Sequence, residues 1–236
     1  MAVAESERVL FQPSPAGIWR LRGWAPSWVS AGMTDRTADR RVLLAQWSAA
    51  TRVVEAQQVH GASLAVIRAT GAIDVPIAGC DALLTDVPGT ALFIRTADCL
   101  PIFMIDPIRR AVGIAHVGWR GLAAQLPLRL IGALRHTYHS APEELRAAIG
   151  PAIHACCYEV GPEFEQRFGR CVQQDAGRRT CDLIRVVTEQ LTCGGIRQER
   201  ITDSQLCTAS NLQQWFSLRR EGPSTGRMLS FIMIHS

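Results

Sequence analysis

The sequence has no lysine at all. Its 236 residues carry a net charge of +4, which comes from 25 arginines and 21 acidic residues. The arginines occur singly or in pairs without aromatic residues between them, which excludes the basic patch of a nucleic-acid-binding protein. Because guanidinium groups bind oxyanions through a planar fork, the bias toward arginine favours an anionic ligand such as phosphate. An arginine preference of the genome explains the bias equally well.

Long apolar runs are also missing. The longest ones, at residues 100–105 and 231–234, have the length of strands, whereas a membrane-spanning helix needs about 18 residues or more. Residues 1–8 contain two glutamates and lack the basic and then apolar pattern of a secretion signal. The sequence therefore predicts a cytoplasmic protein without a membrane partner.

The eight cysteines form no Cys-x-x-Cys pair and lack the short spacings of a disulfide-bonded mini-protein. In a reducing compartment most of them should be free thiols, many of them small buried side chains. With 47% hydrophobic residues, a chain of this length can bury a core that needs neither disulfides nor a metal ion to fold. A metal ion in this protein is therefore expected to be functional.

Hydrophobic patterning predicts a single α+β (mixed α/β) domain over residues 1–236, with helices layered on mixed β-sheets and no linker or repeat. We expect a monomer or a small homo-oligomer. The predicted strands are 17–22, 53–59, 63–68, 82–85, 90–96, 101–105, 111–117 and 227–234. The predicted helices are 37–50, 121–138 and 180–193. Pro127 kinks the second helix or marks its true start, and Gly194 and Gly195 end the third.

Three segments place reactive side chains where predicted strands end. His60 precedes a glycine turn, Cys99 lies in the short break between two apolar strands, and His116 lies at the junction of a strand and a helix. A thiolate and two imidazoles suit Zn²⁺ and leave its fourth tetrahedral position for water or substrate. The three residues lie far apart in the chain, however. Their spacing leaves open the alternative that both histidines are hydrogen-bonded core residues and Cys99 a buried thiol.

A series of ordered motifs resembles one known family. The segments are 58–61 (QVHG), 81–85 (DALLT), 96–101 (TADCLP), 116–121 (HVGWRG), 150–153 (GPAI), 157–161 (CYEVG) and 216–220 (FSLRR). They closely resemble the signatures of the bacterial laccase-domain family, from about residue 52 to the C-terminus. That family was first described as multicopper polyphenol oxidase and is now regarded as purine nucleoside phosphorylase.

The resemblance implies a laccase-domain/CNF-like sandwich with one Zn²⁺, or alternatively Cu²⁺, held by His60, Cys99 and His116. It implies phosphorolysis of adenosine, inosine and methylthioadenosine together with deamination of adenosine, so that the partners are purine nucleosides and phosphate. Metal-activated water would serve the deamination, and a Lewis acid or a proton donor near the purine would help it to leave.

Several further residues are candidates for this site. Arg120, Arg219 and Arg220, with Arg36 behind them, are candidate phosphate ligands because arginine pairs well with phosphate, although each could equally form a surface or structural ion pair. Asp98 would orient a metal-bound histidine, act as acid or base, or simply cap local amides. Cys157, or Glu159 close to it, is a candidate for the pocket lining, and a strand-end turn is the alternative.

One departure from the family pattern concerns residues 1–50. Members usually carry a Thr-x-Arg-x-Gly-Gly stretch, an Asn-Leu-Gly segment and a Gly-Asp-Asp run before the first histidine motif. Here Thr34-Asp35-Arg36 is followed at once by residues 37–40 (TADR), and the rest is missing. We therefore predict a shortened N-terminal region, which puts the substrate range and even the activity in question.

Three other functions remain open. The first is a metal-free cysteine hydrolase in which His60 or His116 activates Cys99 as the nucleophile. The second is a copper-dependent phenol oxidase, although three motif-placed ligands cannot assemble a cluster of several coppers. The third is a degenerate binding paralogue without turnover, because its N-terminal region is shortened.

Overall fold

The computed structural model describes residues 10–14, 16–38, 40–45, 52–68 and 76–235. In this part of the chain the strands form two six-stranded sheets and one two-stranded sheet. The first large sheet contains, in spatial order, β1 (Leu10–Pro13), β2 (Ile18–Arg22), β3 (Val29–Thr34), β14 (Met228–Ile234), β7 (Thr90–Thr96) and β4 (Arg52–Glu55). All neighbours in it are antiparallel except β4 and β7, which pair in parallel.

The second large sheet is also mixed. Its spatial order is β13 (Ile201–Asp203), β10 (Arg146–Ile149), β8 (Leu100–Asp106), β9 (Ala111–Val117), β6 (Ala82–Thr85) and β5 (Leu64–Ile67). The outer pairs β10·β13 and β5·β6 are parallel, and the inner pairs are antiparallel. The small sheet is the hairpin of β11 (Val172–Asp175) and β12 (Arg178–Cys181).

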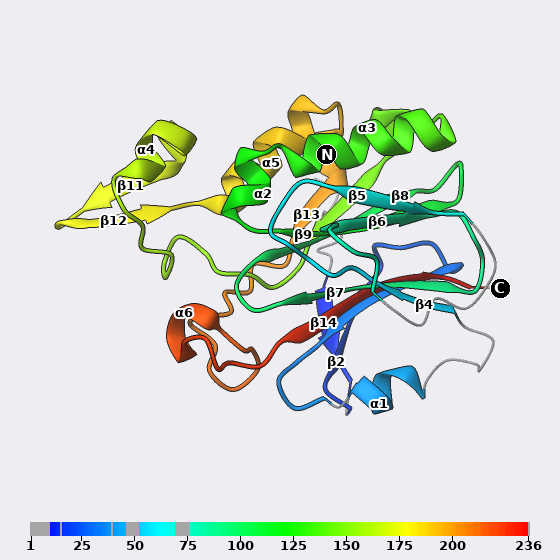
Figure 1. The fold of residues 1–236 in the computed structure, drawn as a ribbon, viewed down its shortest axis with the longest axis horizontal. Coiled ribbons are helices and arrows are strands. Elements are labelled where there is room, and N and C mark those ends of the chain that lie inside the picture. The colour runs from blue at the N-terminus through cyan, green and yellow to red at the C-terminus, as the bar shows by residue number, and fades with distance from the viewer. Residues whose placement is uncertain (1–9, 15, 39, 46–51, 69–75, 236) are drawn as a thin grey trace, which may run out of the picture.

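The two large sheets stack face to face, with helices on the outside (Figure 1). The helices are α1 (Arg40–Leu44), α2 (Trp119–Ala123), α3 (Leu126–Tyr138), α4 (Glu163–Phe168), α5 (Leu183–Cys193) and α6 (Leu218–Glu221). In the ribbon, α2, α3 and α5 cover the second sheet, and α1 lies on the outer side of the first. The structure thus confirms the mixed fold with sheets and helices in layers.

The strand β8 shows why the layers form. All seven of its residues are buried, and residues 100–105 accordingly form a continuous apolar run without alternation. Its side chains nevertheless point alternately to two cores, as the pleat of a strand requires. Ile102 and Met104 belong to the core under the helices, and Phe103 and Ile105 belong to the core between the two sheets.

The predicted helix at 121–138 is in fact two helices, α2 and α3. Gln125, between them, adopts a left-handed backbone with φ 59°, and Pro127 lies in the first turn of α3, where the missing N–H costs nothing. Pro127 therefore marks the true start, one of the two alternatives that the sequence left open. From that start, Leu130 and Leu134 lie buried against the sheet.

The helix α5 begins later than predicted. The Asp182 side chain accepts a hydrogen bond from the backbone N–H of Arg185 at 2.9 Å and so caps the first turn. Residues 178–181 belong to β12 instead, and the predicted end at Cys193 is confirmed. Among the described helices, every one is too short or too polar to cross a membrane.

The central strands were the easiest to predict. The strands β6, β7 and β9 begin and end at the predicted residues, whereas β4 ends at Glu55 instead of residue 59. The strands β1, β3, β10, β11 and β13 and the short helices α4 and α6 were not predicted. Of the predicted helix at 37–50, α1 is present, and residues 46–51 lie outside the described residues.

Candidate active site

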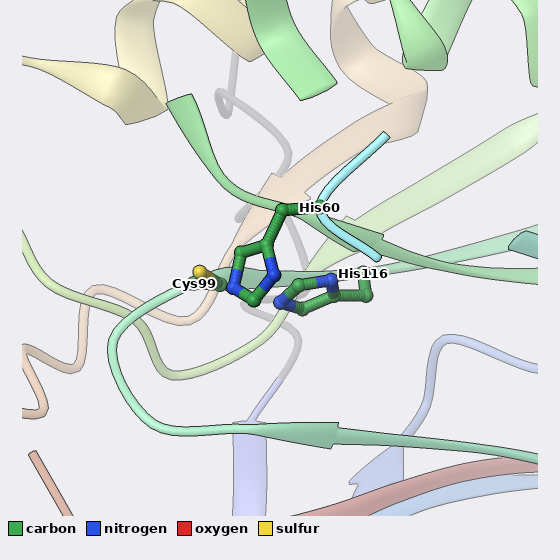
Figure 2. Close-up of side chains that lie close together, drawn as sticks. All are labelled: His60, Cys99 and His116. Carbon is green, nitrogen blue, oxygen red and sulfur yellow. The ribbon is translucent and has the colours of Figure 1, made fainter. Parts of the chain in front are cut away.

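His60, Cys99 and His116 meet at one end of the sandwich (Figure 2). His60 lies in the loop after β4, Cys99 in the turn from β7 to β8, and His116 near the end of β9. Their candidate ligand atoms all lie within 4.8 Å of one another, and the two imidazole centroids are 4.7 Å apart at an interplanar angle of 85°. We call these three residues the tripod.

A buried carboxylate holds the two histidines of the tripod in place. Asp81, just before β6, is fully buried. Its Oδ1 lies 2.8 Å from Nδ1 of His116, which leaves Nε2 as the nitrogen available to a ligand. The same carboxylate accepts hydrogen bonds from the backbone N–H groups of His60 at 2.9 Å and Gly61 at 2.7 Å. One side chain thus fixes both the ring of His116 and the loop of His60.

The loop before His60 has an unusual backbone that other contacts stabilise. Gln58 and His60 both adopt positive φ angles, 60° and 58°, which side-chain-bearing residues adopt rarely. The side-chain amide of Gln58 forms two 2.7 Å hydrogen bonds with the backbone of Arg95 in β7. Left-handed residues of this kind persist where the surroundings fix them, and they gather at functional sites.

Gly118 leaves the space that the tripod needs. A Cβ atom at this position would lie 3.1 Å from Sγ of Cys99 and 3.6 Å from Cδ2 of His60. The first of these contacts is tighter than ordinary packing allows, so any larger residue would push the sulfur away. The glycine in the HVGWRG segment therefore lets the backbone pack closely against the sulfur of Cys99.

Contacts within and beside the tripod shift the pKa values of Cys99 and His116. Burial raises the pKa of Cys99, but hydrogen bonds with His116 and His60 outweigh burial and lower it to about 6. Burial lowers the pKa of His116, but hydrogen bonds with Asp81 and Cys99 outweigh it and raise it to about 9. Between these values the thiolate and the imidazolium form an ion pair in the metal-free protein.

The donor set fits a zinc ion. One sulfur and two imidazole nitrogens are borderline-soft ligands of the kind Zn²⁺ takes, and three protein ligands leave a position open. The thiolate is already ionised near neutral pH, and Asp81 sets the orientation of His116 as carboxylates do in zinc sites. The geometry therefore suits a catalytic zinc site better than a structural one.

A cavity of about 360 Å³ opens beside the tripod. This volume lies within the usual range for small-molecule sites, roughly 300–1,000 Å³. Its lining residues are His60, Ala97, Asp98, Cys99, Gly118, Trp119, Arg120, Ile153, Tyr158, Leu183, Leu218 and Arg219. Aromatic, apolar and cationic side chains thus surround the candidate metal ligands.

Comparison with known proteins identifies the family of this chain. Residues 33–235 match the family model described as multi-copper polyphenol oxidoreductase laccase. The chain belongs to this laccase family. It is 35% identical over 217 residues to purine nucleoside phosphorylase YlmD of Geobacillus stearothermophilus, covering 84% of this chain and 79% of that protein. It is 32% identical over 208 residues to purine nucleoside phosphorylase YfiH of Escherichia coli, covering 83% and 79% of the two chains.

Solved structures resemble this laccase-family chain closely. The crystal structure of YfiH from Bacillus licheniformis superposes with a TM-score of 0.87 at 26% identity, covering 95% of this chain and 98% of that one. That of YlmD from Geobacillus stearothermophilus gives a TM-score of 0.85 at 29% identity, covering 96% and 99%. The layered sandwich is therefore the fold of this laccase family.

Asp98 plays a different part in the laccase-family site from Asp81. Its carboxylate accepts hydrogen bonds from Thr208 Oγ1 at 2.6 Å, Ser217 Oγ at 3.1 Å and the backbone N–H of Arg219 at 2.7 Å. It lines the cavity and ties the start of α6 to the cysteine turn. Its contacts are two hydroxyls and one amide from distant segments, not the local amides of a turn, and Asp81 is the carboxylate that contacts His116.

The candidate arginines separate into two pairs. Arg120 and Arg219 line the cavity, where their guanidinium groups lie over the rings of Trp119 and Tyr158. Arg220 instead donates to the backbone carbonyls of residues 208, 209 and 215. Arg36 pairs with Glu221 at 3.1 Å and also lies outside the cavity lining. Arg120 and Arg219 are therefore the better candidates for an anionic ligand.

The sequence missed three residues of this site. Cys157 was the candidate for the lining, but Tyr158 beside it takes that place, and Cys157 turns toward a different cluster. Trp119 was quoted within its motif without a role, and so was Asp81. An aspartate directly before an apolar strand gave the only sequence signal for Asp81, and that pattern also fits an ordinary turn.

Proposed function

We propose that this protein is a zinc-dependent purine nucleoside phosphorylase that cleaves adenosine, inosine and methylthioadenosine. The proposal rests on one observation. The tripod lies at the wall of a cavity of about 360 Å³, and Arg120 and Arg219 line the same cavity. The names of the relatives from Geobacillus stearothermophilus and Escherichia coli give the reaction class.

In phosphorolysis a phosphate oxygen bonds to C1′ of the ribose while the bond from C1′ to N9 of the purine breaks. The products are the free base, which takes up one proton, and ribose 1-phosphate, or 5-methylthioribose 1-phosphate from methylthioadenosine. Arg120 and Arg219 would bind and orient the phosphate, because guanidinium groups pair with its oxygens. The contact of Asp98 with the Arg219 backbone would hold that arginine in position.

Tyr158 is suited to assist the leaving purine. Burial raises the pKa of its hydroxyl, so the group stays protonated at neutral pH and can donate a hydrogen bond. A donor near the base would stabilise the negative charge that develops as the bond to C1′ breaks. We therefore assign Tyr158 the role of hydrogen-bond donor to the purine.

His60, Cys99 and His116 would hold the metal ion, with Asp81 orienting His116. A zinc ion bound there would supply Lewis-acid chemistry next to the substrate, and Cu²⁺ is the alternative ion for the same ligands. The same site would deaminate adenosine, a hydrolysis in which water replaces the amino group at C6 and inosine and ammonia leave.

The test is chromatography of inosine and adenosine reactions with one equivalent of zinc, with and without phosphate. We expect hypoxanthine or adenine only when phosphate is present, inosine from adenosine in either buffer, and neither product with Cys99→Ala. Absence of base release from a folded, zinc-loaded protein would refute the phosphorylase, and absence of inosine as well would favour a non-enzymatic binding protein.

The phosphate contacts have their own test. We expect Arg219→Met and Arg120→Met to raise the KM for phosphate at least tenfold, because each loses a charge-assisted contact. Arg129→Met, on the exposed side of α3, is the matched control and should leave this KM unchanged. An unchanged KM in both cavity variants would mean that phosphate binds elsewhere.

A second candidate function is a metal-free cysteine hydrolase. The lowered pKa of Cys99 and the raised pKa of His116 favour it, since a thiolate beside an imidazolium is an activated nucleophile. Iodoacetamide alkylation of Cys99 separates the two functions. A rate that is indifferent to chelator and to zinc favours the hydrolase, and protection by zinc favours the metal enzyme.

A further inference from the structure

A second group of potential metal ligands lies outside the tripod. Cys156 and Cys157 follow the GPAI segment, and Cys207 follows β13. Their three sulfur atoms lie within 4.8 Å of one another, and the sulfurs of Cys156 and Cys157 are 3.6 Å apart. We call these residues the cysteine cluster. All three are free thiols.

Backbone pairing brings the two segments of the cysteine cluster together. Ala152 forms a parallel bridge with Cys207, in which its N–H donates to Leu206 at 3.1 Å and its carbonyl accepts from Thr208 at 2.9 Å. The hydrogen bond from the Cys157 N–H to the His154 carbonyl, at 2.9 Å, closes the turn that places Cys157. The sulfurs are thus juxtaposed by the fold and not by a chance meeting of mobile loops.

The three residues of the cysteine cluster differ in their exposure to solvent. Cys207 is buried, Cys157 is half-buried and Cys156 is exposed. An ion could therefore reach the sulfurs from solvent and be held against the protein on its inner side. Arg178 donates to the carbonyl of Cys156 at 3.0 Å, which places a positive charge beside sulfurs that become negative on deprotonation.

We propose that the cysteine cluster is a second metal site that binds one soft monovalent cation of the Cu(I) class. Among His, Cys, Asp and Glu side chains in the described part of the chain, the donors grouped here are sulfur alone. Soft thiolates bind Cu(I), zinc and iron–sulfur clusters, and a shell of only three sulfurs is the number that distinguishes Cu(I), which is satisfied by three. Zinc, by contrast, takes four ligands in closed sites and suits the mixed donors of the tripod.

The backbone also contacts the innermost sulfur of the cluster. The backbone N–H of His154 donates to Sγ of Cys207 at 3.5 Å. A donor of this kind favours a thiolate at Cys207. A cation bound by the three sulfurs would displace their protons, since metal ions bind thiolates.

The test is anaerobic titration of the reduced full-length chain with Cu(I) in competition with a bathocuproine chelator. The background variant is Cys99→Ala, which removes the sulfur of the tripod. We expect one Cu(I) per chain in this background, with only sulfur neighbours in X-ray absorption. Adding Cys207→Ser should weaken binding at least a hundredfold, whereas adding Cys193→Ser, an exposed cysteine at the end of α5, should not change it.

Circular dichroism of each variant shows whether it folds. If Cys207→Ser does not fold, Cys157→Ser replaces it and should give the same loss. Retention of Cu(I) by both folded variants would overturn the proposal. So would uptake of zinc in preference to Cu(I), or a thiol count showing that two of the three cysteines form a disulfide under the anaerobic conditions.

Discussion

The tripod and the cysteine cluster are alike in burial and unlike in chemistry. Each has three donors within 4.8 Å, of which one is buried, one half-buried and one exposed. The tripod combines sulfur with imidazole, has a buried carboxylate behind it and opens on a cavity. The cysteine cluster is all sulfur and depends on backbone pairing. Donor identity and the groups that orient the donors, not burial, therefore distinguish a candidate catalytic site from a candidate binding site.

Removing the sulfur of the tripod should have the largest effect. We expect Cys99→Ala to lower kcat/KM for inosine phosphorolysis on the order of 10³-fold or more, because the Cys99 thiolate is one of the three proposed metal ligands. Cys193→Ser is the control and should keep full activity, since this exposed cysteine lies outside the cavity lining. Comparable activity of the two variants would remove the distinction between the tripod and other thiols.

Removing the charge behind the tripod should have the next largest effect. Asp81→Asn keeps the shape of the side chain, but we expect zinc affinity to fall roughly 10–100-fold, as for carboxylates that orient metal-bound histidines. In the metal-free protein the pKa of His116 should fall from about 9, because its main favourable contact is with Asp81. Zinc competition titration and NMR of the imidazole measure the two effects.

Asp182→Asn is the matched control for this variant. It makes the same substitution at the cap of α5, where asparagine serves as well as aspartate. Zinc affinity should not change there. Equal loss of affinity in both variants, or an unshifted pKa of His116 in Asp81→Asn, would contradict a positioning role for Asp81.

The pH dependence of zinc binding follows from the two pKa values of the tripod. Between pH 7 and 8.5 the Cys99 thiol, with a pKa of about 6, is already ionised, whereas His116, with a pKa of about 9, still carries a proton. Zinc needs the neutral imidazole, so binding should release about one proton, and the affinity should rise about tenfold per pH unit. Calorimetry in buffers of different ionisation enthalpy counts the protons, and a count near zero would contradict the ion pair.

Crowding the sulfur should have the smallest effect. We expect Gly118→Ala to weaken zinc binding by a few fold, because its Cβ would lie 3.1 Å from the Cys99 sulfur. Gly132→Ala in α3 has nothing within 4 Å of the new Cβ. It should stabilise the helix by about 0.5–1 kcal/mol without altering zinc affinity. Zinc titration with thermal unfolding compares them, and equal zinc affinities would show that the site tolerates the extra atom.

The strands with continuous apolar runs were predicted best from the sequence. The central strands β6, β7 and β9 are buried or nearly so along their length, and their boundaries were confirmed. Cys99 follows β7 and His116 lies near the end of β9, so their place at strand ends could also be predicted. The strand β3 contains Ser30 and Gly32 and was read as a turn, and β10 was left unassigned.

Contacts between residues far apart in the chain could not be predicted from the sequence. The bonds from Asp81 to His116 and from Asp98 to Thr208 and Ser217 cross between segments that only the folded chain brings together. For the same reason the sequence did not reveal that Cys207 meets Cys156 and Cys157. The shortened N-terminal region and the single proposed domain over residues 1–236 stay predictions.

The most direct test is zinc X-ray absorption spectroscopy of the chain loaded with one equivalent of zinc. The central claim is that His60, Cys99 and His116 bind one ion together. We expect one sulfur neighbour at about 2.3 Å and two nitrogen neighbours at about 2.0–2.1 Å. A shell of three or four sulfurs, or one without sulfur, would contradict the claim.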